Sequence, residues 1–280
     1  MPIDPTEARW FRKGQASAKA MLKVYERARR ETYATILELG PKNGGLTATH
    51  NRSILYQLDQ IINKLKQEAS TLLTGTTLNA LKDGAESAAE EVSKLTGKPE
   101  LTISLSRLNP VLVEYHALRS LELIKGVTDE MKSAIRLELA TVQARGLHAK
   151  EAGKRIAGLL GKDAKLPADR AARRSVLKRY ASRGETIART EFAEAANESF
   201  MKTLEQAAEL GLEVGKRWSA TLDGRTSNRC RGLHAKYNQR AIPLNAPFVA
   251  PDGWTGQGAP AHPNCRSRVM SGALTAKDNE

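Results

Sequence analysis

Two cysteines and two of the five histidines lie close together near the C-terminal end of the sequence. Cys230 and His234 are four residues apart, so on a helix their side chains would share one face. His262 and Cys265 are three residues apart in a proline-flanked turn, a spacing typical of metal knuckles. Two sulfur and two nitrogen ligands form a common tetrahedral zinc set. The pattern therefore predicts a zinc site, and because four protein ligands leave no open position, the metal would be structural.

A second interpretation of these residues needs no metal. Two buried thiols with hydrogen-bonded histidines fit the same sequence, and the CxxC pairs that mark many zinc sites are missing. A Cys230–Cys265 disulfide also fits the spacing but would not persist in a reducing compartment. Zn²⁺ is thus the one candidate cofactor, and the choice between metal and free thiols is open.

A third interpretation is catalytic. Asp223–Thr226 could form an active-site loop with His234 or His262 as the base. Cys230 or Cys265 beside a histidine, with an orienting carboxylate, would suit a zinc- or thiol-dependent hydrolase such as a nuclease. The sequence contains no GxxxxGKS, HExxH or GxSxG motif. We therefore expect a protein without enzymatic activity and keep the hydrolase as the alternative.

Positive charge is concentrated in one segment. The net charge is +13, and residues 142–190 carry 13 basic and 4 acidic residues. Such a density attracts polyanions, but Tyr180 is the only aromatic residue there, so binding would use the backbone of double-stranded DNA without sequence preference. A solvated helix face explains the same charge equally well. The candidate DNA-contacting residues are Arg170, Arg173, Arg174, Lys178, Arg179 and Arg183.

The spacing of apolar residues predicts helices through most of the chain. Asp4 is expected to cap the first helix with Glu7 reaching back, and Thr128 and Ser182 are expected to cap later ones. The helices predicted by apolar spacing and by breaker residues cover 4–39, 49–73, 77–95, 110–124, 128–146, 149–160, 167–181 and 182–210, while 101–108 is ambiguous between helix and strand.

Alternation replaces the helical period after Gly211. It predicts a strand over 214–222, then a short helix capped by Thr226 or Ser227, and a final strand over 266–270. The fold class is therefore mostly α with a small C-terminal α+β module and an elongated N-terminal helical region. No apolar run approaches the roughly 20 residues needed to cross a bilayer, and no signal-peptide pattern is present, so we expect action in a cytoplasm or inside something assembled there.

Four ordered pieces of the sequence carry a family resemblance. They are Ile187–Phe192 leading into Ala195–Glu198, then Trp218–Thr226, Cys230–His234 and Pro260–Arg266. From about Thr128 to Val269 the chain resembles the phage Mu F-like head morphogenesis family, the minor head proteins of tailed bacteriophages. The motif positions are Arg189, Thr190, Glu191, Asn197, Trp218, Asp223, Arg225, Thr226, Pro263, Asn264 and Arg266.

The resemblance suggests structural roles for this motif. Arg189 and Glu191 are two apart and cannot face each other on a helix, so each is expected to reach a different partner in the α+β module, such as Asp223 or Arg225. Trp218 is expected to anchor the core of the module. Relatives often carry further cysteines near positions 227 and 267, where this chain has serines.

The resemblance also implies a place in the virion. A minor capsid protein of this family joins the procapsid in the host cytoplasm, sits near the portal vertex inside the head, and contacts portal, capsid or scaffold proteins and packaged DNA, with no membrane involved. The expected regions are a helical portal- and partner-binding region (1–126), a basic helical region (127–211), the α+β module (212–272) and a disordered tail (273–280). Docking would use apolar helical faces on the portal.

Overall fold

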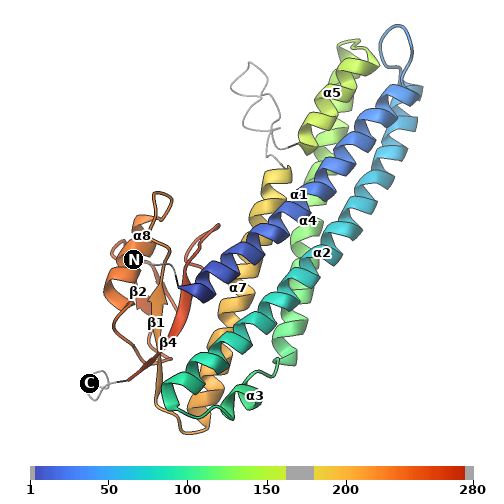
Figure 1. The fold of residues 1–280 in the computed structure, drawn as a ribbon. Helices are drawn as coiled ribbons and strands as arrows, with labels where there is room; N and C mark the ends of the chain where they lie inside the picture. Colours follow the sequence, from blue (N-terminus) through green and yellow to red (C-terminus); the bar gives the residue numbers. More distant parts are fainter. Residues whose placement is uncertain (1–3, 162–179, 275–280) are drawn as a thin grey trace. The chain divides into compact units, whose positions relative to one another are not determined.

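The computed structural model describes residues 4–161 and 180–274 (Figure 1). Its helices are α1 (Pro5–Leu39), α2 (Ala48–Thr96), α3 (Leu101–Leu105), α4 (Pro110–Ala144), α5 (Ala149–Leu160), α7 (Tyr180–Glu209) and α8 (Asn228–Tyr237). Its strands are β1 (Val214–Ser219), β2 (Phe248–Val249), β3 (Thr255–Gly256) and β4 (Arg268–Ala273). The predicted fold class, a long helical N-terminal region followed by a small module with short antiparallel strands, is confirmed.

Two predicted helix breaks do not exist. Gly75 lies within α2, which merges the helices expected over 49–73 and 77–95. Gly126 and Thr128 lie within α4, where the Thr128 hydroxyl donates to the carbonyl of Ile124 at 3.0 Å instead of capping a new helix. A glycine inside a helix costs about 1 kcal/mol relative to alanine. Burial of apolar residues on either side of each glycine outweighs that cost.

The start of α1 was predicted in part. Asp4 caps the helix, since its Oδ1 accepts from the backbone N–H of Glu7 at 2.9 Å. The Glu7 side chain does not reach back to the cap. It accepts hydrogen bonds from Ser219 at 2.8 Å and from Thr221, more than 200 residues away in sequence.

Other boundaries shift by smaller amounts. The ambiguous segment 101–108 contains the short helix α3, and the strand expected over 214–222 ends at Ser219. Ser182 lies inside α7, because the buried Tyr180 and Ala181 extend this helix before it. The helix expected over 167–181 falls almost entirely outside the described residues, as do residues 275–280 of the expected disordered tail.

The chain forms two compact units. One contains Met1–Ala16, Thr74–Arg119 and Ala188–Glu280, and the other contains Ser17–Leu73 and Ser120–Ile187. Each unit is thus built from segments far apart in the sequence. The functional division into regions 1–126, 127–211 and 212–272 stays a prediction.

The second unit is helical. Segments of α1, α2 and α4 lie side by side in it, with α5 beside them (Figure 1). Residues at helical spacing fill its core, among them Met21, Tyr25, Ile54, Leu58, Ile62, Met131, Ile135 and Leu139. These side chains are almost fully buried, so the amphipathic pattern is explained by helix packing. In the part of the chain that the structure describes, no helix combines the length and apolarity required to span a membrane.

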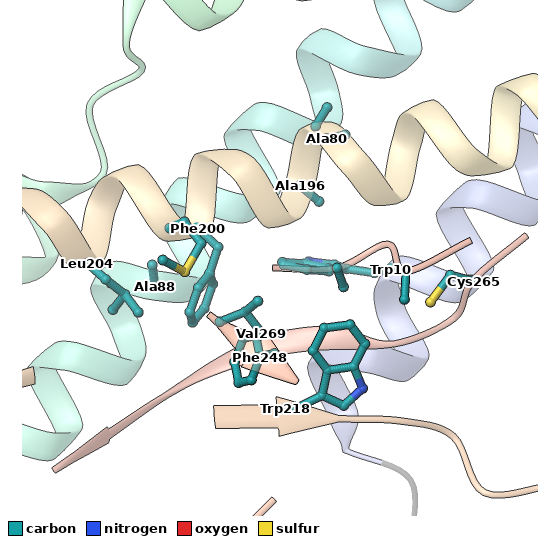
Figure 2. Close-up of a cluster of buried hydrophobic side chains, with 14 of the residues drawn as sticks. Trp10, Ala80, Ala88, Ala196, Phe200, Leu204, Trp218, Phe248, Cys265 and Val269 are labelled. Carbon is teal, nitrogen blue, oxygen red and sulfur yellow. The ribbon is translucent and has the colours of Figure 1, made fainter. Parts of the chain in front are cut away.

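The first unit packs the α+β module on helices. β1 pairs with β4 in antiparallel register, which sets Trp218 opposite Val269 and Ser219 opposite Arg268. β2 pairs with β3 in a second two-stranded sheet. Figure 2 shows Phe200 and Leu204 of α7 facing Val269, with Trp10 of α1 in the same cluster. This core fixes α7 against β4 and so positions the loop that precedes β4.

Candidate metal centre

Cys230 is positioned by the first turn of α8. Ser227 is the N-cap of this helix, and its Oγ accepts from the backbone N–H of Cys230 at 3.2 Å. The same hydroxyl lies 2.9 Å from Nε2 of His262. One serine therefore both begins the helix and holds the histidine, which narrows the predicted choice of Thr226 or Ser227 to Ser227.

His262 and Cys265 are positioned by the loop before β4. The backbone N–H of Cys265 donates to the carbonyl of His262 at 3.1 Å, which closes a turn. Asn264 in this turn has a positive φ of 60°, a conformation that asparagine tolerates better than most residues, and its backbone N–H donates to Thr190 Oγ1 of α7 at 3.2 Å. Nδ1 of His262 lies 2.9 Å from the carbonyl of Pro263. Because a carbonyl oxygen can only accept, Nδ1 carries a proton, and Nε2 faces Ser227 and Cys230.

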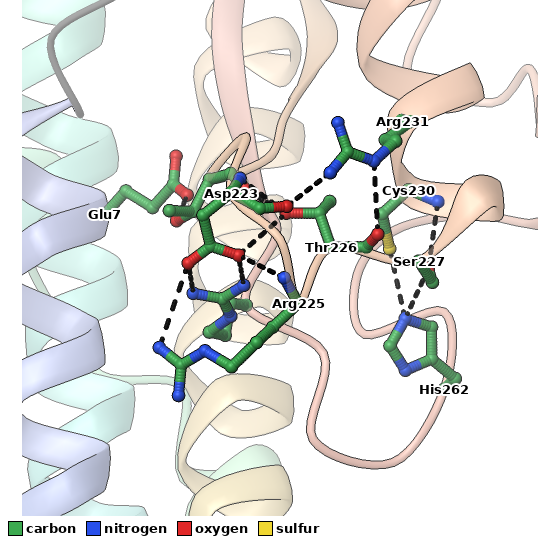
Figure 3. A network of polar contacts seen from close by, with 10 residues as sticks. Glu7, Asp223, Arg225, Thr226, Ser227, Cys230, Arg231 and His262 are labelled. Carbon is green, nitrogen blue, oxygen red and sulfur yellow. Dashed lines mark hydrogen bonds and ion pairs between the residues drawn. The ribbon is translucent and has the colours of Figure 1, made fainter.

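Three potential ligand atoms converge at this point, and Figure 3 shows two of the residues, Cys230 and His262. Cys230 Sγ lies 3.2 Å from His262 Nε2 and 3.6 Å from Cys265 Sγ, and all three atoms lie within 4.8 Å of one another. Around a tetrahedral zinc ion the corresponding separations are about 3.6 Å for sulfur to nitrogen and about 3.8 Å for two sulfurs. The donor set and its dimensions therefore suit Zn²⁺ after small adjustments. This supports a metal site without establishing a bound ion.

The pKa values of the two thiols are shifted in opposite directions. A hydrogen bond from Cys265, together with hydrogen bonds from Ser227 and Ser267 and the charge of His262, lowers the pKa of Cys230 to about 5. The bond to Cys230, burial and the charge of Cys230 raise the pKa of Cys265 well above its usual value. The pair thus favours one thiolate at neutral pH, and a thiolate is the form that binds a metal.

His234, the fourth predicted ligand, lies outside this cluster. Its Nδ1 accepts from the backbone N–H of Ala220 at 3.0 Å, and burial lowers the pKa of its ring. His234 therefore helps to fix the end of β1. Sharing a helix face with Cys230 does not bring the two ligand atoms to one point.

Asp223 forms a polar junction beside the cluster (Figure 3). Its carboxylate accepts from Arg266 at 2.7 and 2.5 Å and from the backbone N–H of Arg225 at 2.8 Å. The Arg266 bonds hold the pKa of Asp223 well below its usual value. Thr226 Oγ1 accepts from the backbone N–H of Asp223 at 3.0 Å. This junction ties the loop after β1 to the loop that holds Cys265.

The motif residues of α7 are connected differently from the prediction. Glu191 pairs with Arg119 of α4 at 2.8 Å, so its expected contact with the α+β module is wrong. Arg119 is drawn to this face because it also reaches Glu194 at 2.9 Å. Arg189 has no hydrogen bond or ion pair within the described residues, and its expected partner Asp223 is taken by Arg266.

Asn197 is the residue that links α7 to the sheet. Its Oδ1 accepts from the backbone N–H of Val269 in β4 at 2.7 Å, and its Nδ2 donates to the carbonyl of Ala193 at 2.7 Å. Trp218 is fully buried and packs edge to face on Phe248 and Trp254, as predicted for a core anchor.

Sequence reasoning missed a buried charge cluster on β4. Arg268 is only 2% exposed and contacts Asp4 at 3.0 Å and Glu91 at 2.6 Å. Glu91 also accepts from the backbone N–H of Ser271 at 2.9 Å. The one available signal was an arginine within an otherwise apolar strand pattern, but its partners lie more than 170 residues away in sequence.

The predicted DNA-contacting residues are largely outside the described part of the chain. This applies to Arg170, Arg173, Arg174, Lys178 and Arg179. Arg183 is described, and its guanidinium pairs with Glu130 at 2.6 Å. The geometry of these residues therefore leaves the DNA prediction untested.

Comparison with known proteins gives one match. The family model for phage Mu protein F like proteins matches residues 128–270, just over half of the chain. No curated protein and no solved structure matches. The matched range contains Cys230, His262 and Cys265 together with the Asp223 junction and the motif residues of α7. The chain therefore belongs to the phage Mu protein F like family.

Proposed function

We propose that this chain is a minor capsid protein of a tailed bacteriophage that joins the procapsid during head assembly, next to the portal. Membership of the phage Mu protein F like family supports a role in head morphogenesis and hence a virion component. This match is the observation that carries the proposal. The position inside the head, the portal contact and the DNA contact are further steps of the proposal.

An apolar stripe on α4 supports the portal contact. Val111, Tyr115 and Leu118 are 72%, 45% and 56% exposed, and their spacing of four and three places them on one face of this helix. Exposed apolar side chains at helical spacing suit docking into a groove of a partner. The stripe lies in the region 1–126, which we assign to partner binding.

The portal contact can be tested with a matched pair of variants. Leu118→Asp should weaken co-sedimentation of the chain with purified portal rings by roughly tenfold or more, because it sets a charge in the apolar contact. Leu137→Asp is the control, since Leu137 is 59% exposed on the same helix but lies outside region 1–126. Equal binding of both variants and the unsubstituted chain would refute this docking surface.

The basic segment supports contact with packaged DNA. Residues 142–190 carry 13 basic and 4 acidic residues, so they would neutralise phosphates and release counterions. Replacing Arg173, Arg174, Lys178 and Arg179 by glutamine should reduce the slope of log affinity against log salt by roughly 3.6, with equal effects on unrelated duplexes. An unchanged slope would remove DNA from the proposal.

The metal centre supports a structural role. Cys230, His262 and Cys265 would hold Zn²⁺, and the hydroxyl of Ser227 or a water molecule would complete four ligands. The metal would join α8 to the loop before β4, two elements with few apolar residues of their own. We therefore propose that the zinc stabilises the module.

A hydrolase is the second candidate, because three protein ligands leave one position for an activated water. The cavity that includes Cys230 and His262 has a volume of only about 20 Å³. Such a space holds about one water molecule and does not enclose a substrate. This favours the non-enzymatic proposal, and nuclease turnover that disappears in His262→Ala while the fold is retained would overturn it.

A further inference from the structure

A second, larger cavity lies in the unit that contains the α+β module. It has a volume of about 200 Å³ and is lined by α1, α7 and the loops that carry Arg225 and Asn264. Trp10, Phe11 and Phe192 supply an apolar wall. Neither Cys230 nor His262 of the candidate metal centre lines this cavity, although Cys265 does.

Four arginines line this cavity, and they differ in how far they are neutralised. Arg266 is held by both oxygens of Asp223, and Arg268 is held by Asp4 and Glu91. Arg225 reaches Asp223 only at 3.8 Å and is 71% exposed. Arg189 has no counter-ion within residues 4–161 and 180–274. Positive charge without a matched carboxylate is therefore present at Arg189 and, in part, at Arg225.

The one carboxylate of the lining is already committed. Glu7 accepts hydrogen bonds from Ser219 and Thr221, and burial raises the pKa of its carboxyl group. It therefore offers little compensation to Arg189. The charge balance of the cavity calls for one further negative group.

Three N–H donors of the lining residues are buried without a hydrogen-bond acceptor: Nε of Arg189, Nε1 of Trp10 and Nε of Arg268. Nε of Arg268 has the carboxylate of Asp4 at 3.0 Å as an ion-pair partner, which leaves Arg189 and Trp10, the latter only 5% exposed. Buried polar groups are almost always hydrogen-bonded, and a charged donor left alone is the most costly case. Both donors call for an acceptor, and the guanidinium calls for an anionic one.

We propose that this cavity binds a small organic carboxylate. Its anionic group pairs with Arg189 and Arg225, and its apolar body lies against Trp10, Phe11 and Phe192. A single negative charge matches the unpaired guanidinium of Arg189 and the loosely paired one of Arg225. The apolar wall favours a carboxylate on a flat apolar body over a bare inorganic anion. This site is independent of the proposed head-assembly role.

Benzoate is the test ligand, measured by titration calorimetry on the full-length protein, with benzamide as the neutral analogue and acetate and inorganic phosphate as anions without an apolar body. Benzoate should bind at least about tenfold more tightly than each of the other three. Benzoate should also shift the indole N–H resonance of Trp10 in an amide correlation spectrum, assigned with Trp10→Phe.

Two variants locate the site. Arg189→Gln should weaken benzoate binding by roughly tenfold or more, while Arg107→Gln, which removes an exposed arginine outside the lining, should leave it within about twofold. Arg189→Lys keeps the positive charge and should retain part of the affinity for benzoate. It provides a second test in case Arg189→Gln alters the fold.

Three results would overturn the proposal. They are no benzoate binding at concentrations up to about 10 mM, equal binding of benzamide or phosphate, and benzoate binding that is insensitive to Arg189→Gln in a protein with an unchanged circular dichroism spectrum.

Discussion

The buried charge cluster around Arg268 permits a quantitative test of how the first unit is held together. Arg268 is 2% exposed, and its guanidinium contacts Asp4 of the α1 cap and Glu91 of α2 and stacks over the rings of Trp10 and Phe200. We consider Glu91→Gln, which removes one negative charge without removing much volume. Arg268 then keeps the carboxylate of Asp4, which is 30% exposed, and the hydrogen bond to the carbonyl of Val269.

The expected loss of stability in Glu91→Gln follows from the cost of leaving the buried guanidinium of Arg268 with one carboxylate fewer. Breaking a buried ion pair from one side costs roughly 3–5 kcal/mol, and the glutamine oxygen can still accept from the backbone N–H of Ser271. We therefore expect a loss of about 3 kcal/mol in the free energy of unfolding. The double variant Glu91→Gln with Arg268→Met removes both charges and keeps the acceptor for Ser271. It should recover much of this loss, because replacing both members of a buried ion pair is often nearly neutral.

Tryptophan fluorescence during urea unfolding is a suitable assay. The three tryptophans, Trp10, Trp218 and Trp254, all lie in the unit that contains Arg268, so their emission reports on this unit. The control is Glu205→Gln, because Glu205 lies in the same unit. Its ion pair with Lys202 is exposed (46% for Lys202 and 41% for Glu205) and should contribute less than about 1 kcal/mol. A loss below about 1 kcal/mol in Glu91→Gln, or a double variant no better than additive, would refute the reasoning.

Three further predictions follow from other contacts. Burial lowers the pKa of Lys216 to about 8, so the unfolded chain binds more protons than the folded chain between about pH 8 and 10.5. The free energy of unfolding should therefore rise with pH through this window, by about 3 kcal/mol relative to Lys216→Met. Parallel pH profiles of the two proteins would contradict this. A Cβ at Gly84 would lie 2.1 Å from the carbonyl oxygen of Ala196, so Gly84→Ala should destabilise the protein by roughly 2 kcal/mol or more in thermal melts, whereas Gly75→Ala, which meets no atom within 4 Å, should not destabilise it. Cys265→Ser should reduce the zinc content, measured by mass spectrometry, from about one ion per chain to well below one, and equal zinc in both proteins would exclude Cys265 as a ligand.

Local signals in the sequence were sufficient where the interaction is local. Asp4 was identified as a cap because its acceptor and the N–H of Glu7 are three residues apart. His262 and Cys265 were paired correctly because a short turn brings both to one point. The alternating pattern after Gly211 likewise predicted β1, although both faces of this strand prove to be largely buried.

Interactions over long sequence distances could not be predicted in this way. The partners of Glu7, Arg268 and Asn197 depend on how α1, α2 and α7 pack on the sheet, and no spacing encodes that packing. The helix breaks expected between residues 73 and 77 and at Gly126 are absent, because the local cost of a glycine is visible in the sequence, whereas the burial that offsets it is not.

The position of His234 shows a limit of the helical-face rule. A spacing of four residues puts Cys230 and His234 on one face, but the two side chains are one turn apart along the axis. The ring of His234 therefore meets the end of β1 at Ala220, while Cys230 meets the loop of His262. Two side chains on the same face of a helix therefore do not necessarily bind the same metal ion.

The central claim, that this chain is a head protein recruited next to the portal, is tested most directly by the composition of purified procapsids. Quantitative mass spectrometry should find the chain in procapsids assembled with portal protein and should find it reduced at least about tenfold in procapsids assembled without portal, at equal amounts of major capsid protein. Procapsids that lack the chain in both cases, or contain equal amounts of it in both, would contradict the account.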